Sequence, residues 1–399
     1  MESNTTQSGS VVELQQFSNL ISDNQLLEAL TRGGIVTPTP VQAETIPHAM
    51  EGKDLIVQAQ TGSGKTLAFM LPILMKLRQE KPTIGTAALI ITPTRELALQ
   101  ICKVVSELCP DIQPVCVIGG SSIRGQRSQL RSDRRVVVGT PGRLLDMIER
   151  RELLLRKCSQ FVLDEADEML SMGFIEDVRS ILKRLPPKRQ GMFFSATLPP
   201  RITMLAQSFL KSPTVVKIES NETTKPDIKH LFAKVSGGIA DKASALCNIL
   251  EEFNPSSAII FCNTRSDTEL LEVFMRRRGL NAQRINSDLS QRERGAVLDG
   301  LRSGTLRYLI ATDVAARGID IEHLELVVNY SIHADSETYV HRTGRTGRAG
   351  RSGTAISLVA PHDHGSFYGL RRSLEVNFEE MQVPSAASAD RKPTALTGS

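Results

Sequence analysis

Short apolar runs recur along the first half of the chain, and each is followed at once by a polar or glycine-rich segment. The runs occupy residues 55–57, 88–91, 136–138, 161–163 and 192–194. Between them lie amphipathic stretches at residues 96–108, 144–152 and 174–185. Apolar runs that alternate with amphipathic segments are typical of βα units on a parallel sheet. The pattern therefore predicts a doubly wound α/β domain.

The alternation lapses once and then resumes. Residues 211–227 form a polar stretch that contains Pro213 and Pro226, and such segments mark loops. A second series of apolar runs follows at residues 258–261, 282–285, 308–310, 326–328 and 354–358. No sequence repeat is visible, but the order of predicted elements repeats. We therefore expect two domains of one architecture.

The predicted organisation has five parts. Residues 1–12 and 384–399 are polar, and we expect them to be disordered tails. The first domain is predicted at 13–215, a linker at 216–228 and the second domain at 229–383. The fold class is α/β, with each domain a mostly parallel sheet flanked by helices.

Composition narrows the function. The chain has 48 basic and 44 acidic residues and a net charge of +4, so any nucleic-acid site must be local. No apolar run reaches the length of about eighteen residues that a membrane span needs, and the amino terminus lacks a secretory signal pattern. We expect a soluble, cytoplasmic protein with no membrane partner. The six cysteines form no CxxC pair, which favours buried thiols over a zinc site or a disulfide framework.

A glycine-rich segment follows the first apolar run and precedes a predicted helix. It reads Ala59-Gln60-Thr61-Gly62-Ser63-Gly64-Lys65-Thr66. Backbone N–H groups and the helix dipole can hold phosphates at such a helix start, where Lys65 would reach the β- and γ-phosphates and Thr66 would bind Mg²⁺. Because position 59 is Ala where the generic phosphate-binding loop has Gly, a plain glycine-rich turn is the alternative.

Three carboxylates gather after the apolar run 161–163, in the segment Asp164-Glu165-Ala166-Asp167. Open α/β sheets bind ligands at the carboxyl ends of their strands. We interpret Asp164 as a Mg²⁺ ligand, mostly through water, and Glu165 as the group that orients and deprotonates an attacking water. The alternative is a charged helix start, where the helix dipole favours acids.

Together these motifs resemble those of the superfamily 2 helicases and, through the literal Asp-Glu-Ala-Asp, those of the DEAD-box RNA helicases. The resemblance extends from Phe17 to about Leu358. In chain order the motifs are Phe17, Gly34 with TPTPVQ (37–42), AQTGSGKT (59–66), PTRELA (93–98), Gly119-Gly120, TPGR (140–143), DEAD (164–167), SAT (195–197), IIFCNT (259–264), ATDVAARGID (311–320) and HRTGRTGR (341–348). The resemblance implies two tandem RecA-like domains that use ATP with Mg²⁺ and bind RNA.

The resemblance also assigns roles around the nucleotide in the first domain. Gln42 would read the adenine edge, because a carboxamide can pair with N6 and N7 of adenine. Phe17 would pack near the base, although an apolar residue there is also typical of a helix-capping contact, and Thr37 belongs to the same nucleotide-binding segment. Ser195 and Thr197 would hydrogen-bond the DEAD carboxylates and couple hydrolysis to domain closure.

In the second domain the resemblance assigns the remaining nucleotide contacts. Asp320 would contact the ribose, and His341 would link the second domain to the DEAD segment. Arg345 and Arg348 match arginine fingers, which stabilise the charge on a transferring γ-phosphoryl group. Without the resemblance, this Gly- and Arg-rich stretch could equally be a flexible basic loop.

Backbone recognition of RNA agrees better with the composition than base stacking does, since the chain has no Trp and only four Tyr. Loops after first-domain strands offer hydroxyl, N–H and guanidinium groups to phosphates, from Pro93, Thr94, Arg95, Gly119, Gly120, Thr140 and Arg143. By resemblance, the matching positions in the second domain are Thr264, Arg265, Thr312 and Asp313. Such contacts do not read bases, so we expect weak sequence preference, with the ribose 2′-hydroxyl separating RNA from DNA.

The chain departs from the family pattern in the second domain. Asn286-Ser287 precede Asp288 where the family commonly has His-Gly, and losing Gly limits how closely the backbone can approach RNA. Leu301 lies where an aromatic residue is usual, and Ser331 and His333 replace the usual Asp and Pro. We expect these changes to affect RNA affinity and domain closure.

The sequence thus predicts an ATP-dependent RNA helicase that locally separates short duplexes or remodels RNA–protein complexes, with RNA-stimulated ATP hydrolysis. An ATP-locked RNA clamp with slow turnover is the alternative, which the intact Glu165 and SAT segment disfavour. The literal DEAD argues against a DNA translocase, and HRTGRTGR argues against a transport ATPase or kinase. We expect a monomer whose specificity is broad or set by protein partners.

Overall fold

The chain divides into two compact units, residues 1–220 and 221–399. The computed structural model describes residues 16–60, 62–80, 85–132, 134–218, 227–286, 288–316, 324–347, 352–374 and 376–384. The predicted tails lie outside these ranges, apart from residue 384. Within the described ranges, no helix combines the length and the apolar character that crossing a membrane requires.

The first unit is built on a parallel sheet with strand order β3-β4-β2-β5-β6-β1-β7. Its strands are β1 (Leu55–Gln58), β2 (Ala88–Ile91), β3 (Val115–Val117), β4 (Val136–Gly139), β5 (Gln160–Leu163), β6 (Gln190–Ser195) and β7 (Thr214–Lys217). Every residue of β2, β4, β5 and β6 is buried. Strands buried on both faces read as continuous apolar runs, which explains the pattern in the sequence.

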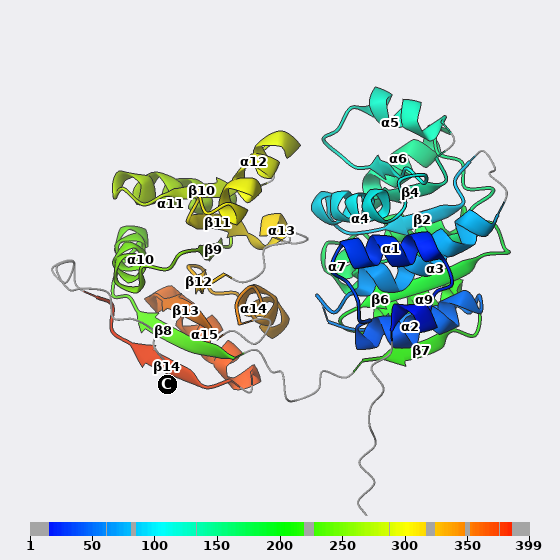
Figure 1. The fold of residues 1–399 in the computed structure, drawn as a ribbon. Helices are drawn as coiled ribbons and strands as arrows, with labels where there is room; N and C mark the ends of the chain where they lie inside the picture. Colours follow the sequence, from blue (N-terminus) through cyan, green and yellow to red (C-terminus); the bar gives the residue numbers. More distant parts are fainter. Residues whose placement is uncertain are drawn as a thin grey trace, which may run out of the picture. The chain divides into compact units, whose positions relative to one another are not determined.

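Helices cover both faces of this sheet (Figure 1). One face packs against the 3₁₀-helix η1 (Phe17–Asn19) and against α1 (Asn24–Arg32), α2 (Pro40–Met50), α3 (Lys65–Gln79) and α4 (Arg95–Leu108). The other face packs against α6 (Pro141–Glu149), α7 (Ala166–Ser171), α8 (Ile175–Leu182) and α9 (Pro200–Phe209). A further helix, α5 (Ile123–Leu130), follows the edge strand β3. Successive strand residues alternate between the two cores, so Leu55 and Val57 enter the first and Ile56 the second.

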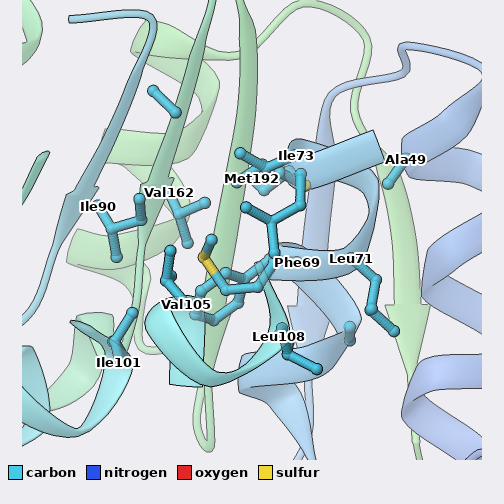
Figure 2. Close-up of a cluster of buried hydrophobic side chains, with 14 of the residues drawn as sticks. Ala49, Phe69, Leu71, Ile73, Ile90, Ile101, Val105, Leu108, Val162 and Met192 are labelled. Carbon is cyan, nitrogen blue, oxygen red and sulfur yellow. The ribbon is translucent and has the colours of Figure 1, made fainter. Parts of the chain in front are cut away.

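Phe69 of α3 belongs to the first core, which also contains Ile73, Val105, Val162 and Met192 (Figure 2). Its ring meets the ring of Phe194 at a centroid distance of 5.1 Å and an interplanar angle of 61°. Edge-to-face aromatic pairs of this kind add roughly 0.5–1.5 kcal/mol beyond their burial. This contact holds α3, and with it the glycine-rich loop, against the centre of the sheet.

The second unit repeats the topology, with a parallel sheet in the order β10-β11-β9-β12-β13-β8-β14. Its strands are β8 (Ile228–Lys234), β9 (Ala258–Cys262), β10 (Ala282–Ile285), β11 (Tyr308–Thr312), β12 (Leu326–Asn329), β13 (Gly353–Val359) and β14 (Phe378–Met381). Its helices are α10 (Ile239–Phe253), α11 (Arg265–Arg277), α12 (Gln291–Arg302), α13 (Asp313–Ala316), α14 (Ser336–Thr343), the 3₁₀-helix η3 (Pro361–Asp363) and α15 (His364–Ser373). The predicted fold class and the repeated architecture are confirmed.

Two details refine the sequence reading. Strand β7 includes residues 216 and 217, and β8 begins at Ile228, so strands extend into both ends of the predicted linker. The domain boundaries themselves stay predictions, because residues 219–226 lie outside the described ranges. Burial of the thiols is confirmed for Cys109, Cys158, Cys247 and Cys262, whereas Cys102 and Cys116 are half-buried.

We predict that Phe194→Ala lowers the free energy of unfolding of the first unit by about 3–5 kcal/mol, because it removes a fully buried ring and leaves a cavity. Urea denaturation followed by circular dichroism measures the change. The control is Met204→Ala, whose side chain is 64% exposed and should cost less than about 0.5 kcal/mol. Equal effects of the two substitutions would contradict the packing described here.

Candidate nucleotide and nucleic-acid site

The order of the strands decides which loops meet at the carboxyl edge of the first sheet. Strands β5, β6 and β1 are neighbours, so the DEAD segment, the SAT segment and the glycine-rich loop leave the sheet side by side. Strands β3, β4 and β2 are also neighbours, and they bring together the loops proposed for RNA. Because β2 pairs with β5, the two groups form one continuous row.

The glycine-rich loop is packed against Gln42 of α2. The Gln42 Nε2 donates to the carbonyl of Gly64 at 3.0 Å, and its Oε1 accepts from the backbone N–H of Thr39 at 2.9 Å. Gly64 has φ +96, and a Cβ at this position would clash with the Gln42 carboxamide, so both its conformation and its surroundings require glycine. Gln42 is buried, and its predicted contact with adenine stays a prediction.

Lys65 begins α3 and closes the loop on itself. Its Nζ donates to the carbonyl of Ala59 at 2.9 Å, and the N–H of Ala59 donates to the carbonyl of Ser195 at 3.0 Å. Within the loop, the Ser63 hydroxyl donates to the carbonyl of Gln60 at 2.7 Å. The start of the glycine-rich loop is therefore hydrogen-bonded both to Lys65 and to Ser195 at the end of β6.

The two acids after β5 both carry an energetic cost. Burial raises the pKa of Asp164 to about 6, against the opposing effects of the nearby Lys65 charge and of the backbone N–H of Glu165, which donates to Asp164 at 3.0 Å. Glu165 adopts the left-handed backbone conformation, with φ 52 and ψ 55. For a residue other than glycine this costs about 1–3 kcal/mol and is typical of functional sites.

Asp167 links the DEAD and SAT segments. Its Oδ2 accepts from the backbone N–H groups of Ala196 and Thr197, at 3.1 and 2.7 Å, and from the hydroxyl of Thr197 at 3.0 Å. Thr197 thus forms the predicted bond to a DEAD carboxylate. The Ser195 hydroxyl also contacts the DEAD segment, where it accepts from the backbone N–H of Asp167 at 3.2 Å, and its bond to a carboxylate stays a prediction.

Among the loops proposed for RNA, the guanidinium group of Arg95 packs against the backbone of Gly119 and Gly120. A Cβ on Gly120, which has φ +78, would come within 2.6 Å of the Arg95 Nη1. The same loop 92–95 contains Pro93 and Thr94, both buried, and Thr94 caps α4 by accepting from the N–H of Leu97 at 3.3 Å. In the described part of the chain, no acceptor pairs with the Arg95 guanidinium, which is half-buried.

Arg143 is anchored to residues 119–122, the glycine loop that follows β3. Its Nη1 donates to the carbonyl of Ser121 at 3.2 Å and to the Oε1 of Gln126 at 3.3 Å. The N–H of Thr140 donates to the carbonyl of Val117 at 3.1 Å, which joins the TPGR segment to the end of β3. The structure therefore brings together every residue that the sequence proposed for RNA contacts in the first unit.

In the second unit the dominant feature is Arg342, which sequence reasoning missed. Its Nε and Nη2 donate to the two carboxylate oxygens of Asp313, each at 2.6 Å, and it also bonds the carbonyl of Ser331 at 2.7 Å and the Oδ1 of Asn263 at 3.0 Å. Arg342 is 2% exposed. Because both oxygens of Asp313 are committed, its predicted RNA contact stays a prediction that this geometry does not favour.

Three further predicted residues of this unit, Thr264, Arg265 and Thr312, lie at or just after the ends of β9 and β11. Thr264 caps α11 by accepting from the N–H of Asp267 at 3.1 Å, and Arg265 forms an exposed pair with Asp288 at 2.8 Å. Thr312 accepts from the N–H of Ala315 at 3.4 Å. His341 and Arg345 are half-buried at the end of α14.

Several predicted residues have a less direct outcome. Thr61, Asp320, Arg348 and Ser287 lie outside the described residues. Phe17 is 3% exposed in the first core, and neither its contact with a base nor the helix-capping alternative is tested. Of the remaining nucleotide positions, Thr37 and Gly62 are exposed and Thr66 is half-buried in the first turn of α3.

The departures from the family pattern are accommodated locally. Asn286 is buried, its Oδ1 accepts from the N–H of Asp288 at 3.1 Å, and its Nδ2 has no hydrogen-bond partner among the described residues. Leu301 is part of a buried apolar cluster. Ser331 uses its backbone carbonyl, and the His333 Nδ1 accepts from the N–H of Asp335 at 3.2 Å.

Comparisons with known proteins agree with this geometry. The DEAD/DEAH box helicase family matches residues 39–205, and the helicase conserved C-terminal domain family matches residues 241–350. The chain is 44% identical over 373 residues to the ATP-dependent RNA helicase DeaD of Escherichia coli (strain K12), covering 93% of this chain and 59% of that protein. It is 42% identical over 374 residues to the ATP-dependent RNA helicase CshA of Listeria monocytogenes, covering 93% and 71%. The chain thus spans about three fifths of the length of the DeaD proteins it matches.

Solved structures share the fold. Dbp5 of Saccharomyces cerevisiae bound to RNA and ADP BeF3 has a TM-score of 0.81 and 30% identity, covering 92% of this chain and 95% of that one. A DEAD box protein from Methanococcus jannaschii has a TM-score of 0.51 and 36% identity, covering 92% and 99%.

We predict that Asp164→Asn stabilises the protein at pH 7.5 in EDTA and without nucleotide, by about 1–3 kcal/mol. The pKa raised to about 6 means that the folded state binds a proton more tightly than the unfolded state, so stability falls as pH rises through 6. The gain should shrink toward pH 5 and vanish below about pH 4. Urea unfolding at several pH values measures it, with the exposed Glu107→Gln as control. A loss of stability at pH 7.5 would contradict the cost assigned to the ionised carboxylate.

We predict that Arg342→Met lowers the free energy of unfolding of the second unit by about 3–5 kcal/mol, because it leaves the carboxylate of Asp313 without its buried partner. Adding Asp313→Asn to the same chain should recover part of the loss. The matched control is Arg265→Met, which breaks an exposed Arg–Asp pair and should cost less than about 1 kcal/mol. Thermal and urea unfolding of all three variants test the difference in burial.

Proposed function

The chain belongs to the DEAD-box ATP-dependent RNA helicases, and from this we propose that it hydrolyses ATP in response to RNA and uses the cycle to separate short duplexes locally or to remodel RNA–protein complexes. The observation that supports the proposal most strongly is the continuous row of strand ends in the first unit, in which the loops proposed for ATP and the loops proposed for RNA are contiguous. A change at one set of loops can therefore act on the other through the paired strands β2 and β5.

For the nucleotide, we propose that Lys65 leaves the carbonyl of Ala59 to bind the β- and γ-phosphates, while backbone N–H groups of residues 60–66 surround them. Thr66 and Asp164 supply the oxygen ligands that Mg²⁺ prefers, and the effect of the Lys65 charge on Asp164 indicates that the two strand ends are close. When bound, Mg²⁺ would neutralise phosphate charge. Glu165 would orient the attacking water and take its proton.

The second unit would complete the chemistry. We propose that Arg345 and Arg348 supply positive charge to the transferring γ-phosphoryl group, that Asp320 contacts the ribose and that His341 links to the DEAD segment. A change in the bound nucleotide would reach the SAT segment through Asp167, because its carboxylate accepts three hydrogen bonds from that segment.

For RNA, the described groups suit phosphates rather than bases. The guanidinium groups of Arg95 and Arg143 and the N–H groups of the glycine loop are donors that suit phosphate oxygens. We therefore propose single-stranded or duplex RNA as the partner, with weak sequence preference, and protein partners as the source of any selectivity. The expected monomeric state and cytoplasmic location stay predictions.

We predict that Glu165→Gln reduces RNA-stimulated ATP hydrolysis by about 10²–10⁴-fold, because it removes the proposed general base, while ATP binding stays within a few fold. Steady-state phosphate release with and without single-stranded RNA measures this, with single-stranded DNA as the nucleic-acid control and Glu168→Gln, three residues further along, as the matched variant. Strong stimulation of the unaltered chain by RNA alone supports the remodelling ATPase. Little stimulation together with slow release of RNA in the presence of ATP would instead support the ATP-locked clamp.

A further inference from the structure

Helix α5 follows the glycine loop and is almost entirely exposed, but it buries one glutamine. Its residues Arg124, Gly125, Arg127 and Ser128 are all exposed, whereas Gln126 is 4% exposed. An exposed helix normally turns an apolar residue inward, so a buried carboxamide here requires polar partners.

The partners of Gln126 lie on both sides of the glycine loop. Its Nε2 donates to the carbonyl of Ile118 at 2.9 Å, immediately before Gly119. Its Oε1 accepts from the Nη1 of Arg143 at 3.3 Å, and the same nitrogen donates to the carbonyl of Ser121 at 3.2 Å. The Gln126 side chain thus connects the residue after β3 to the first turn of α6, and Arg143 extends the connection to Ser121 in the loop 119–122.

This connection affects the positions of both Arg95 and Arg143. Gln126 supplies the side-chain acceptor that orients Arg143, and it fixes the start of the glycine loop on which Arg95 lies. Because a carboxamide is neutral, it orients the guanidinium without neutralising it, and the charge stays available to a phosphate. A carboxylate in the same place would form an ion pair with Arg143 and would also repel the carbonyl of Ile118.

We propose that Gln126 is a positioning residue for RNA: it holds the Gly119-Gly120 loop and the Arg143 guanidinium together as one receptor for the sugar–phosphate backbone while keeping the arginine fully charged. The inference rests on the proposed function, since it concerns the same RNA site. It assigns a role to a residue that none of the sequence motifs contains.

Two variants of the full chain test the role. Gln126→Met preserves size but removes both hydrogen bonds, and Gln126→Glu preserves shape but pairs the charge of Arg143. The matched control is Gln129→Met, because Gln129 is exposed on the same helix. The measurements are binding of a fluorescent single-stranded oligouridylate with a non-hydrolysable ATP analogue, the RNA concentration for half-maximal ATPase stimulation, the KM for ATP at saturating RNA, and the thermal midpoint.

For Gln126→Met we expect RNA affinity to fall about tenfold and the half-stimulating RNA concentration to rise in parallel, while the KM for ATP changes less than twofold. For Gln126→Glu we expect an equal or larger loss, and a slope of log affinity against log salt that is smaller by about one, as for the loss of one phosphate contact. Gln129→Met should match the unaltered chain in all four measurements.

Some outcomes would overturn the proposal. RNA affinity and salt slope equal to those of the unaltered chain in both Gln126 variants would exclude a positioning role. A loss of RNA binding accompanied by an equal rise in the KM for ATP and a lower thermal midpoint would show that Gln126 only stabilises the domain. If the unaltered chain neither binds RNA nor is stimulated by it, the proposed function itself is wrong. If RNA stimulates the unaltered chain and the Gln126 variants behave in the same way as that chain, only this inference is wrong.

Discussion

Burial of both faces of each parallel sheet is the constraint on which the rest of the structure depends. A polar group inside either core would lose its contacts with water and find few partners, so the polar groups of the candidate site lie at the ends of the strands. At the carboxyl ends, helices begin directly after the loops, at Lys65, Arg95 and Pro141 in the first unit and at Arg265 in the second. Unpaired N–H groups at these helix starts favour anions, which explains why one architecture, used twice, suits nucleotide and RNA phosphates.

Three polar groups that are buried near these strand ends pair across separate segments. Asp167 joins the DEAD and SAT segments, Arg342 joins α14 to α13, and Gln126 joins the glycine loop to TPGR. Removing one partner of such a pair costs more than its formation contributes, because the other is left buried and unsatisfied. The loops are therefore held as connected sets, and each set can respond to a ligand as a unit.

The central strands could be predicted from the sequence because their apolar runs need no tertiary context. Strands β7, β8 and β14 could not, since each contains exposed residues, and β3 has only three residues. The site shows the same division. Motif spacing placed Lys65, Asp164 and Arg143 at strand ends, but it could not reveal that Ser195 bonds a backbone N–H or that Arg342, rather than its neighbours, turns inward to Asp313. These partners depend on strand order, which residue spacing does not encode.

Asp164 and Glu165 show how the site differs from the fold that supports it. The first is a carboxylate whose burial raises its pKa to about 6, and the second holds a left-handed backbone conformation. Neither feature stabilises β5 or α7, and an apolar residue at the strand end would fit the surrounding core better. A bound cation would lower the pKa of Asp164 and remove most of the cost of its ionised form. The unfavourable energy of the ionised Asp164 is therefore coupled to the ligand, so that binding is favoured by relief of this penalty as well as by new contacts. This coupling places both unfavourable features where a nucleotide would change them, in the same segment as Asp167, whose hydrogen bonds lead to the SAT segment.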